Sequence, residues 1–328
     1  MESVLRQDPR ACPPLKRVEP YASRDVSQHL AIVGSTASGK SALALELARR
    51  VEGLELVSVD SMQVYRGMDI GTAKPTLAEQ AEVPHHLIDL VDPADDYTVT
   101  RFQADFRDAL ASIERRGHRA VLVGGTALYI RAVVDDLAIP GRYADARADV
   151  EAEPDTVALH ARLAELDPVA ASRMEPSNRR RVVRALEVTL GSGRPFSSYG
   201  PGLTAHPPTP YRLVGARMSA ALNRARIEAR CAAQLEAGFV DEVVALAGRP
   251  AGLSRTARQA LGYRELLEHV EGGRRLDACV DDIVTRTGQF ARRQRAWFRR
   301  DPRITWLDVE DDPLDAMTSL IAVATGQT

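Results

Sequence analysis

The stretch HLAIVGSTASGKSALALELARR, residues 29–50, decides the fold. An apolar run at Leu30–Val33 leads into a glycine loop, and good helix formers follow, with Leu43 and Leu47 about one helical turn apart. The loop GSTASGKS fits the pattern G-x-x-x-x-G-K-S, in which backbone N–H groups cradle phosphate oxygens. We therefore predict a strand, a phosphate-binding loop (P-loop) and a helix, in that order.

This loop predicts a site for a diphosphate. Its glycines permit a backbone path with inward-pointing N–H groups, and the following helix adds its positive N-terminal end. Lys40 would supply a point charge and Ser41 a ligand for Mg²⁺. The predicted diphosphate-binding residues of the loop are Gly34, Ser35, Thr36, Ala37, Ser38, Gly39, Lys40 and Ser41. The alternative is a decayed loop that binds nothing, and the motif does not name the ligand beyond its phosphates.

Strand and helix patterns alternate along the rest of the chain. The predicted strands are Leu54–Val59, His86–Leu90, Ala120–Val123, Tyr211–Ala216 and Ile304–Leu307, and the predicted long helices are Val99–Arg116 and Asp281–Arg300. This alternation predicts an α/β fold, a P-loop NTPase-like parallel sheet flanked by helices. Ligands bind such sheets at the carboxyl ends of the strands, where Gly34, Asp60 and Gly124 all fall.

Asp60 ends the second predicted strand, within VDSMQVYRGMDIGTAKP. In a kinase, a carboxylate here would help hold Mg²⁺ or activate the acceptor hydroxyl. In another transferase it would act as a general base on an attacking amine or hydroxyl. The third possibility is a helix cap without chemistry. The residues alone leave these three open.

The strand at Ala120–Val123 runs into Gly124-Gly125-Thr126, where many P-loop proteins have an acid. Glycines let a ligand approach the backbone closely, and Thr126 can donate a hydrogen bond to a phosphate oxygen. The alternative is a tight turn with Thr126 as a helix cap.

Composition excludes several classes of protein. No stretch approaches 18 consecutive apolar residues, so we expect no membrane span. The three cysteines are scattered without metal-ligand spacing or a disulfide framework, which is typical of the reducing cytoplasm. The only lysines are Lys16, Lys40 and Lys74, whereas arginine is common. Lysine in the loop is therefore an exception to the chain's general use of arginine as its basic residue.

The chain divides into four predicted parts. Residues 1–28 lack an apolar signal-peptide core and are predicted to be a disordered tail. Residues 29–143 and 211–310 are predicted to form the core, with a helical insertion at 144–210 and a C-terminal tail at 311–328. The insertion carries the arginine cluster NRRRVVRALEV, which is either a solvated helix face or a contact for a polynucleotide backbone.

Taken together, these stretches resemble the tRNA dimethylallyltransferase family, also called tRNA isopentenyltransferases. The matching strings run in family order over residues 30–307: GSTASGKS, VDSMQVYRGMDIGTAKP, PHHLIDLVDP, VLVGGTALY, RRVVRALEV, GFVDEV, QALGYRE and QFARRQRAWFRR. The second string is the most specific, because no general structural rule requires so long a match. Ser35 and Ser41 stand where the family often has Pro and Thr, and Asn178–Arg180 is more basic than usual.

The resemblance implies transfer of a dimethylallyl group from dimethylallyl diphosphate to N6 of an adenine beside a tRNA anticodon, with Mg²⁺ as cofactor. It implies catalytic roles for Asp60, Thr126 and Lys40, and a diphosphate contact for Arg230. The implied tRNA contacts are Asp60, Ser61, Met62, Gln63, Thr126, Arg180, Arg181, Val182, Val183, Arg184, Arg258, Gln259, Gly262, Tyr263 and Arg264. We expect a cytoplasmic monomer that binds the anticodon stem-loop and no membrane.

Three other hypotheses account for part of the sequence. An ATP-dependent P-loop kinase of a small metabolite explains the loop, but not the DSMQVY string or the arginine-rich later half. Prenylation of free AMP or ADP differs only in the acceptor. A non-catalytic RNA-binding regulator would bind tRNA without making product.

Overall fold

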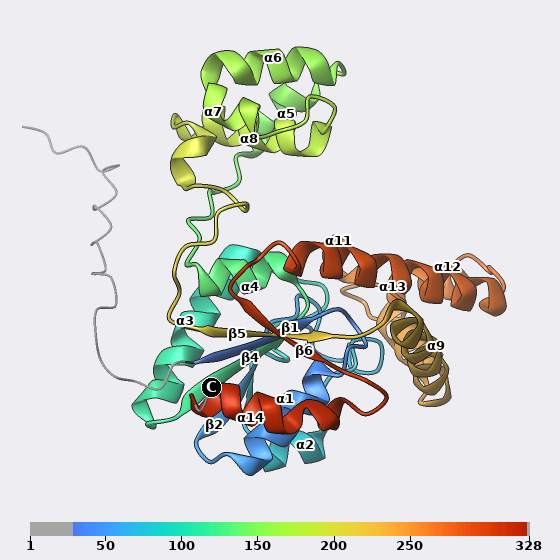
Figure 1. Ribbon diagram of the computed structural model, residues 1–328. Helices are drawn as coiled ribbons and strands as arrows, with labels where there is room; N and C mark the ends of the chain where they lie inside the picture. Colours follow the sequence, from blue (N-terminus) through green and yellow to red (C-terminus); the bar gives the residue numbers. More distant parts are fainter. Residues whose placement is uncertain (1–28, 327–328) are drawn as a thin grey trace, which may run out of the picture.

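The computed structural model describes residues 29–326, so the predicted tail at 1–28 lies outside the described residues. A parallel sheet forms the centre of the protein (Figure 1). It has six strands in the order β3-β2-β4-β1-β5-β6. The strands are β1 Leu30–Gly34, β2 Leu54–Ser58, β3 His85–His86, β4 Arg119–Gly124, β5 Arg212–Arg217 and β6 Ile304–Asp308. The predicted fold class is confirmed.

The third strand is shorter than the predicted His86–Leu90 and begins one residue earlier. Leu87 and Asp89 have φ angles of 63° and 54°, in the left-handed region that extended strands do not use. The extended run therefore ends at His86.

Alternate residues of the strands face opposite sides of the sheet, and each side has its own hydrophobic core. Leu30 and Ile32 pack with α1 (Lys40–Arg50) and the C-terminal helix, whereas Ala31 and Val33 belong to the core beneath α3 and α4. The helices that follow the first strands are α2 Leu77–Glu82, α3 Val99–Arg115 and α4 Ala127–Val134.

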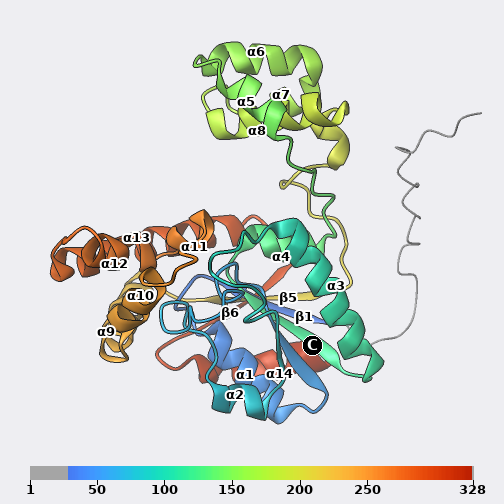
Figure 2. The same cartoon turned by 180° about the vertical axis from the view of Figure 1, so that it is seen from behind.

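Helices from the later half of the chain lie together beside one end of the sheet (Figure 2). They are α9 Ala220–Glu236, α10 Phe239–Ala247, α11 Arg255–Arg258, α12 Tyr263–Val270 and α13 Leu276–Phe298. The buried side chains of α13 include Ile283, Thr287, Gln294 and Phe298, which recur at helical spacing on one face. This stripe brings α13 against α9, α4 and β1.

A group of short helices stands away from the sheet and is joined to it by two connecting segments (Figure 1). It comprises α5 Ala144–Glu151, α6 Thr156–Leu166, α7 Pro168–Ser172, α8 Arg179–Ser192 and the 3₁₀ turn η1 Phe196–Tyr199. The helices enclose a third hydrophobic core of their own, built around Leu159, Leu163, Val182 and Leu186. Residues at 144–210 thus bury apolar surface among themselves rather than against the sheet.

The residues that the sequence set apart as a C-terminal tail are helical up to Thr325. The 3₁₀ turn η2 (Pro313–Ala316) and α14 (Met317–Thr325) pack on α1, and Met317 and Leu320 are buried. Within residues 29–326, no helix is long and apolar enough to cross a membrane.

Candidate diphosphate and RNA site

The P-loop connects the centre of the sheet to α1. Ala37 and Gly39 adopt left-handed φ angles of 60° and 83°, which turn the chain into the helix. A Cβ atom at Gly34 would lie 2.9 Å from the carbonyl oxygen of Ala216, so glycine lets the loop start close beside β5. No side chain caps the N-terminus of α1. The helix therefore presents uncapped N–H groups and its positive end to an anion.

Lys40 lies in the first turn of α1, and its Nζ donates to the carbonyl oxygen of Ser35 at 3.4 Å. Burial lowers the pKa of this ammonium to about 8, with Asp60 acting to raise it and Arg230 to lower it. Burial also lowers the pKa of Arg230, against the opposing influence of Asp60. Two cations and one carboxylate from three distant stretches of chain thus share one electrostatic environment beside the loop.

Asp60 follows β2, two residues after the strand ends. Its Oδ1 accepts a hydrogen bond from the backbone N–H of Met62 at 2.8 Å. This contact caps a turn rather than a helix, since no helix begins there. Its Oδ2 has no hydrogen-bond partner among residues 29–326, so it is available to accept a proton or a hydrogen bond.

Gln63, for which the family resemblance implies a nucleotide contact, also bonds within the protein, and that contact stays a prediction. In the structure its side-chain amide is engaged within the protein. Oε1 accepts from the Ser58 hydroxyl at 2.7 Å, and Nε2 donates to the carbonyl oxygens of Thr72 and Ala73 at 3.2 Å each. Gln63 therefore supports the loop, and it is partly exposed, as Ser61 and Met62 are.

The turn Gly124-Gly125-Thr126 fits tightly against its neighbours. A Cβ atom at Gly124 would lie 2.2 Å from the carbonyl oxygen of Val59, and one at Gly125 would lie 2.4 Å from Nε2 of Gln294. The glycines are thus required by packing within the protein. Thr126 occupies the N-cap position of α4 but makes no side-chain cap hydrogen bond. Its hydroxyl is therefore available to a ligand, in contrast to the alternative in which it caps the helix.

Two residues that hold the P-loop, Asn223 and Gln294, were not predicted from the sequence. Thr36 is held by α9 and α13: its hydroxyl accepts from Arg230 at 2.8 Å, its carbonyl oxygen accepts from Asn223 Nδ2 at 2.9 Å, and its N–H donates to Gln294 Oε1 at 2.8 Å. Gln294 lies within the family string QFARRQRAWFRR and on the buried stripe of α13, but neither feature indicated a contact with the P-loop. Nothing in the sequence distinguished Asn223.

The long string after Asp60 is held by two more residues that were not predicted to function. The Lys74 ammonium is almost fully buried and donates to the carbonyl oxygen of Tyr65 at 2.8 Å and to the carboxylates of Asp69 and Asp89. The Glu242 carboxylate accepts from three consecutive backbone N–H groups, at residues 69, 70 and 71. The loop shape is therefore set partly by α10, which is distant in the sequence.

The arginine cluster of the insertion begins α8. Arg180 and Arg181 are exposed, whereas Val182 and Val183 are buried in the core of the insertion. Arg184 pairs with Glu187 at 2.6 Å and donates to carbonyl oxygens at 140 and 141. Arg180 and Arg181 are thus the most exposed of these predicted RNA contacts, Arg184 is partly exposed, and the two valines are packed inside the insertion.

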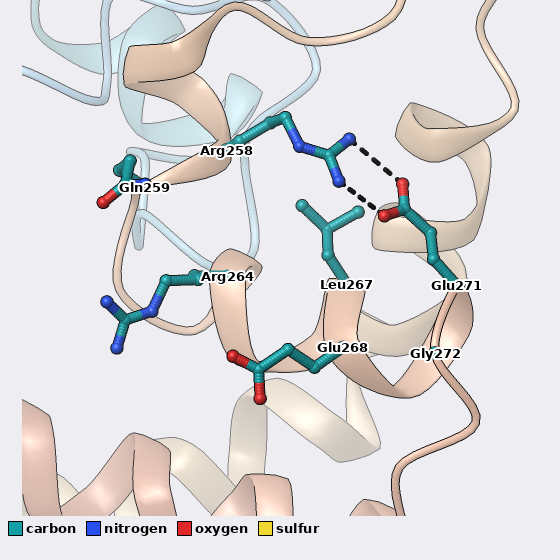
Figure 3. A pocket seen from close by; sticks show the side chains of 7 residues that line it. All are labelled: Arg258, Gln259, Arg264, Leu267, Glu268, Glu271 and Gly272. Atoms are coloured by element: carbon teal, nitrogen blue, oxygen red, sulfur yellow. Dashed lines mark hydrogen bonds and ion pairs between the residues drawn. The ribbon is translucent and has the colours of Figure 1, made fainter.

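Arg258, Gln259 and Arg264 surround an open hollow of about 320 Å³ between α11 and α12 (Figure 3). Arg258 forms a bidentate ion pair with Glu271 across its rim. Gly262 and Tyr263 are buried, and the Tyr263 hydroxyl donates to Glu242 at 2.6 Å. Tyr263 therefore points into the protein rather than toward the predicted RNA contacts.

The described residues contain no group of three or more His, Cys, Asp or Glu that could hold a metal ion. Ser41 is exposed in the first turn of α1, beside the uncapped N–H groups. This arrangement fits Mg²⁺ that is bound through one hydroxyl and the oxygens of a diphosphate rather than a site built wholly from protein ligands.

A P-loop at the carboxyl edge of a parallel sheet, with two cations and a carboxylate beside it, is the arrangement of the P-loop class of α/β proteins and suits phosphate groups. Comparisons with known proteins identify the family within this class. The sequence matches the family model for IPP transferase over residues 63–301 and that for isopentenyl transferase over residues 27–89. The chain belongs to the IPP transferase family.

Curated relatives carry the name tRNA dimethylallyltransferase. One from a Nocardioides species is 45% identical, over 89% of this chain and 95% of the relative, and one from Kineococcus radiotolerans is 47% identical, over 87% and 93%. Among solved structures, the tRNA isopentenylpyrophosphate transferase of Bacillus halodurans has a TM-score of 0.65 at 35% identity, covering 92% of this chain and 98% of the other. A eukaryotic dimethylallyltransferase acting on tRNA has a TM-score of 0.74 at 26% identity, covering 91% and 78%.

Proposed function

We propose that this protein transfers the dimethylallyl group of dimethylallyl diphosphate to N6 of the adenine next to the anticodon of tRNA. The observation that carries the proposal is the placement of Lys40, Arg230 and Asp60 beside one P-loop in a member of this family. The cations suit a leaving diphosphate and the carboxylate suits an incoming nucleophile. The donor carries a diphosphate and no adenosine. All of its charge therefore lies on the diphosphate, which is the part that the P-loop binds.

The first half of the chemistry is departure of diphosphate. The bond between C1 of the dimethylallyl group and the diphosphate oxygen breaks, and the electron pair stays on that oxygen. Lys40, Arg230 and the loop N–H groups stabilise the developing negative charge, and Thr126 can donate a further hydrogen bond. Mg²⁺ held at Ser41 would supply additional charge neutralisation on the diphosphate.

The second half is attack by N6 of adenine. Its lone pair is delocalised into the ring, which makes it a weak nucleophile. As N6 forms its bond to C1, the nitrogen must release a proton, and Asp60 accepts it through the carboxylate oxygen that has no partner among the described residues. The base must leave the loop stack to reach this site. Ser61 and Met62, which are partly exposed beside Asp60, are proposed to contact it.

The tRNA contacts are proposed to lie on two separate surfaces. Arg180 and Arg181 of the insertion are exposed, and Arg258, Gln259 and Arg264 line the hollow near α12. Arginine guanidinium groups form hydrogen bonds and ion pairs with phosphate oxygens. Because the two surfaces lie on different parts of the protein, a ligand that contacts both must be large, as an anticodon arm is. Cytoplasmic location and a monomeric state stay predictions.

The proposal is tested by incubating the protein with unmodified tRNA, Mg²⁺ and dimethylallyl diphosphate. The expected result is a mass gain of one dimethylallyl group on a tRNA whose anticodon is followed by adenine. No gain on such a tRNA would contradict the proposal. A parallel reaction with free AMP in place of tRNA separates tRNA prenylation from nucleotide prenylation. A second reaction, with ATP in place of the isoprenoid donor, detects kinase activity.

A further inference from the structure

Gln294 is a buried amide that joins two loops of the proposed donor site. It projects from α13, with 6% of its surface exposed. Oε1 accepts from the N–H of Thr36 in the P-loop at 2.8 Å, and Nε2 donates to the carbonyl oxygen of Gly125 at 2.8 Å. The two hydrogen bonds span 258 and 169 residues of sequence. The strands that lead into these loops, β1 and β4, already pair side by side, and Gln294 adds a side-chain bridge between the P-loop and the turn that carries Thr126.

The hydrogen bond to Thr36 also decides which loop N–H groups are available to an anion. The N–H of Thr36 donates to Gln294, so it cannot point at a diphosphate while that bond exists. Asn223 holds the Thr36 carbonyl oxygen at 2.9 Å, and Arg295 of α13 supports Asn223 by donating to its Oδ1 at 2.6 Å. The conformation of the loop at Thr36 is thus imposed from α9 and α13.

We propose that Gln294 is a positioning residue of the donor site: it holds the P-loop and the Gly124–Thr126 turn in the arrangement that binds diphosphate. The inference rests on the proposed function, because it takes diphosphate as the ligand of the loop. Gln294 has no role in the proton or bond changes and acts through Thr36 and Gly125. Its amide suits the role because it accepts on one side and donates on the other.

A role in positioning makes a different prediction from a role in stability alone. Gln294→Met keeps a similar side-chain volume and removes both hydrogen bonds, so it leaves no large cavity. Gln294→Glu keeps the acceptor for Thr36 but sets a carboxylate against the carbonyl oxygen of Gly125. Both variants release the P-loop from the turn. Thr285→Ala, on an exposed position of α13, is the control for substitutions in this helix.

The experiment measures binding of inorganic diphosphate with Mg²⁺ by calorimetry, the KM for dimethylallyl diphosphate, the KM for tRNA and the melting temperature. We expect both Gln294 variants to weaken diphosphate binding and to raise the donor KM about tenfold, while the tRNA KM changes less than about twofold. Thr285→Ala should match the wild type. A folded Gln294→Met or Gln294→Glu protein that binds diphosphate as the wild type does overturns the inference, as does an equal rise in KM for donor and tRNA.

The two proposals fail in different ways. If the wild type makes no prenylated tRNA, the proposed function fails, and the comparison of diphosphate binding between wild type and variants still tests Gln294. If the wild type prenylates tRNA and the variants bind diphosphate normally, only the inference about Gln294 fails.

Discussion

At the scale of single residues, Lys40 shows how burial changes the pKa of a side chain in the candidate site. An ammonium group that leaves water gives up its hydration, which favours its neutral form. Burial lowers the pKa of Lys40 from 10.5 to about 8, although Asp60 partly offsets the effect. The group is therefore charged at neutral pH and becomes neutral only slightly above it. A diphosphate that arrives will favour the charged form.

The first prediction concerns pH. Because the donor binds the protonated ammonium, kcat/KM for dimethylallyl diphosphate should fall about tenfold per pH unit above roughly pH 8, where the enzyme without bound donor releases this proton. Initial rates at saturating tRNA, measured from neutral to strongly alkaline pH, report this decline. Lys40→Arg keeps its charge over that range and should show no such decline. A wild-type profile that stays flat throughout would contradict the assignment.

The second prediction concerns Asp60. Asp60→Asn removes the proton acceptor and should lower kcat about 10²- to 10⁴-fold. Binding of inorganic diphosphate should be unchanged or tighter, because a negative charge near the anion is removed. Single-turnover prenylation and calorimetry give the two quantities. The control is Asp108→Asn, at an exposed acid on α3. Wild-type turnover in Asp60→Asn would show that another group takes the proton.

At the scale of elements, the loop after β2 is held by distant helices. Glu242 of α10 joins this loop to α12. Its carboxylate accepts hydrogen bonds from the backbone N–H groups at 69–71 and from the Tyr263 hydroxyl of α12. Gln234 of α9 donates to the carbonyl oxygens of Ile70 and Gly71. Three helices therefore shape the segment that begins at Asp60.

The third prediction follows from this link. Glu242→Ala leaves three backbone N–H groups and one hydroxyl without their acceptor, and should lower the free energy of unfolding by about 2 kcal/mol. Urea denaturation measures the change. Glu236→Ala, at an exposed position near the end of α9, should change stability by less than about 0.5 kcal/mol. Equal effects of the two substitutions would show that the Glu242 contacts contribute little.

At the scale of the whole molecule, the helical insertion is set apart from the sheet (Figures 1 and 2). Its return segment is fixed to the core by two arginines: Arg131 donates to the carbonyl oxygens of Leu203 and Ala205, and Arg303 donates to that of Pro207 at 2.6 Å. Asp135 pairs with both arginines. The base of the insertion is therefore fixed to the core, while its helices pack on one another.

The fourth prediction tests the insertion as an RNA-binding part. The double substitution Arg180→Ala and Arg181→Ala should raise the tRNA KM about tenfold and leave the donor KM unchanged. It should also reduce the slope of log affinity against log salt by about one for each phosphate that the variant no longer neutralises. Filter binding at several salt concentrations measures the slope. Arg162→Ala, at an exposed position on α6, is the matched control. An unchanged slope in the double variant would place the RNA-binding surface elsewhere.

Much of the fold followed from local pattern. The P-loop and its flanks were predictable because glycine conformations and helix spacing act over a few residues. The strand bounds were close for the same reason, except at β3, where the left-handed Leu87 and Asp89 gave no signal in the sequence. The order of the strands was not predicted, since it depends on which strands pair across long connections.

The sequence by itself determined the P-loop, the α/β class, the family and the candidate acid Asp60, because each depends on residues that are adjacent or recur in a specific string. Only the tertiary structure decided which side chains face the site. It turned Tyr263 inward, left Arg180 and Arg181 exposed, and brought Asn223 and Gln294 onto Thr36. The physical reason is that burial and long-range hydrogen bonds depend on where distant helices pack, and no local pattern records that.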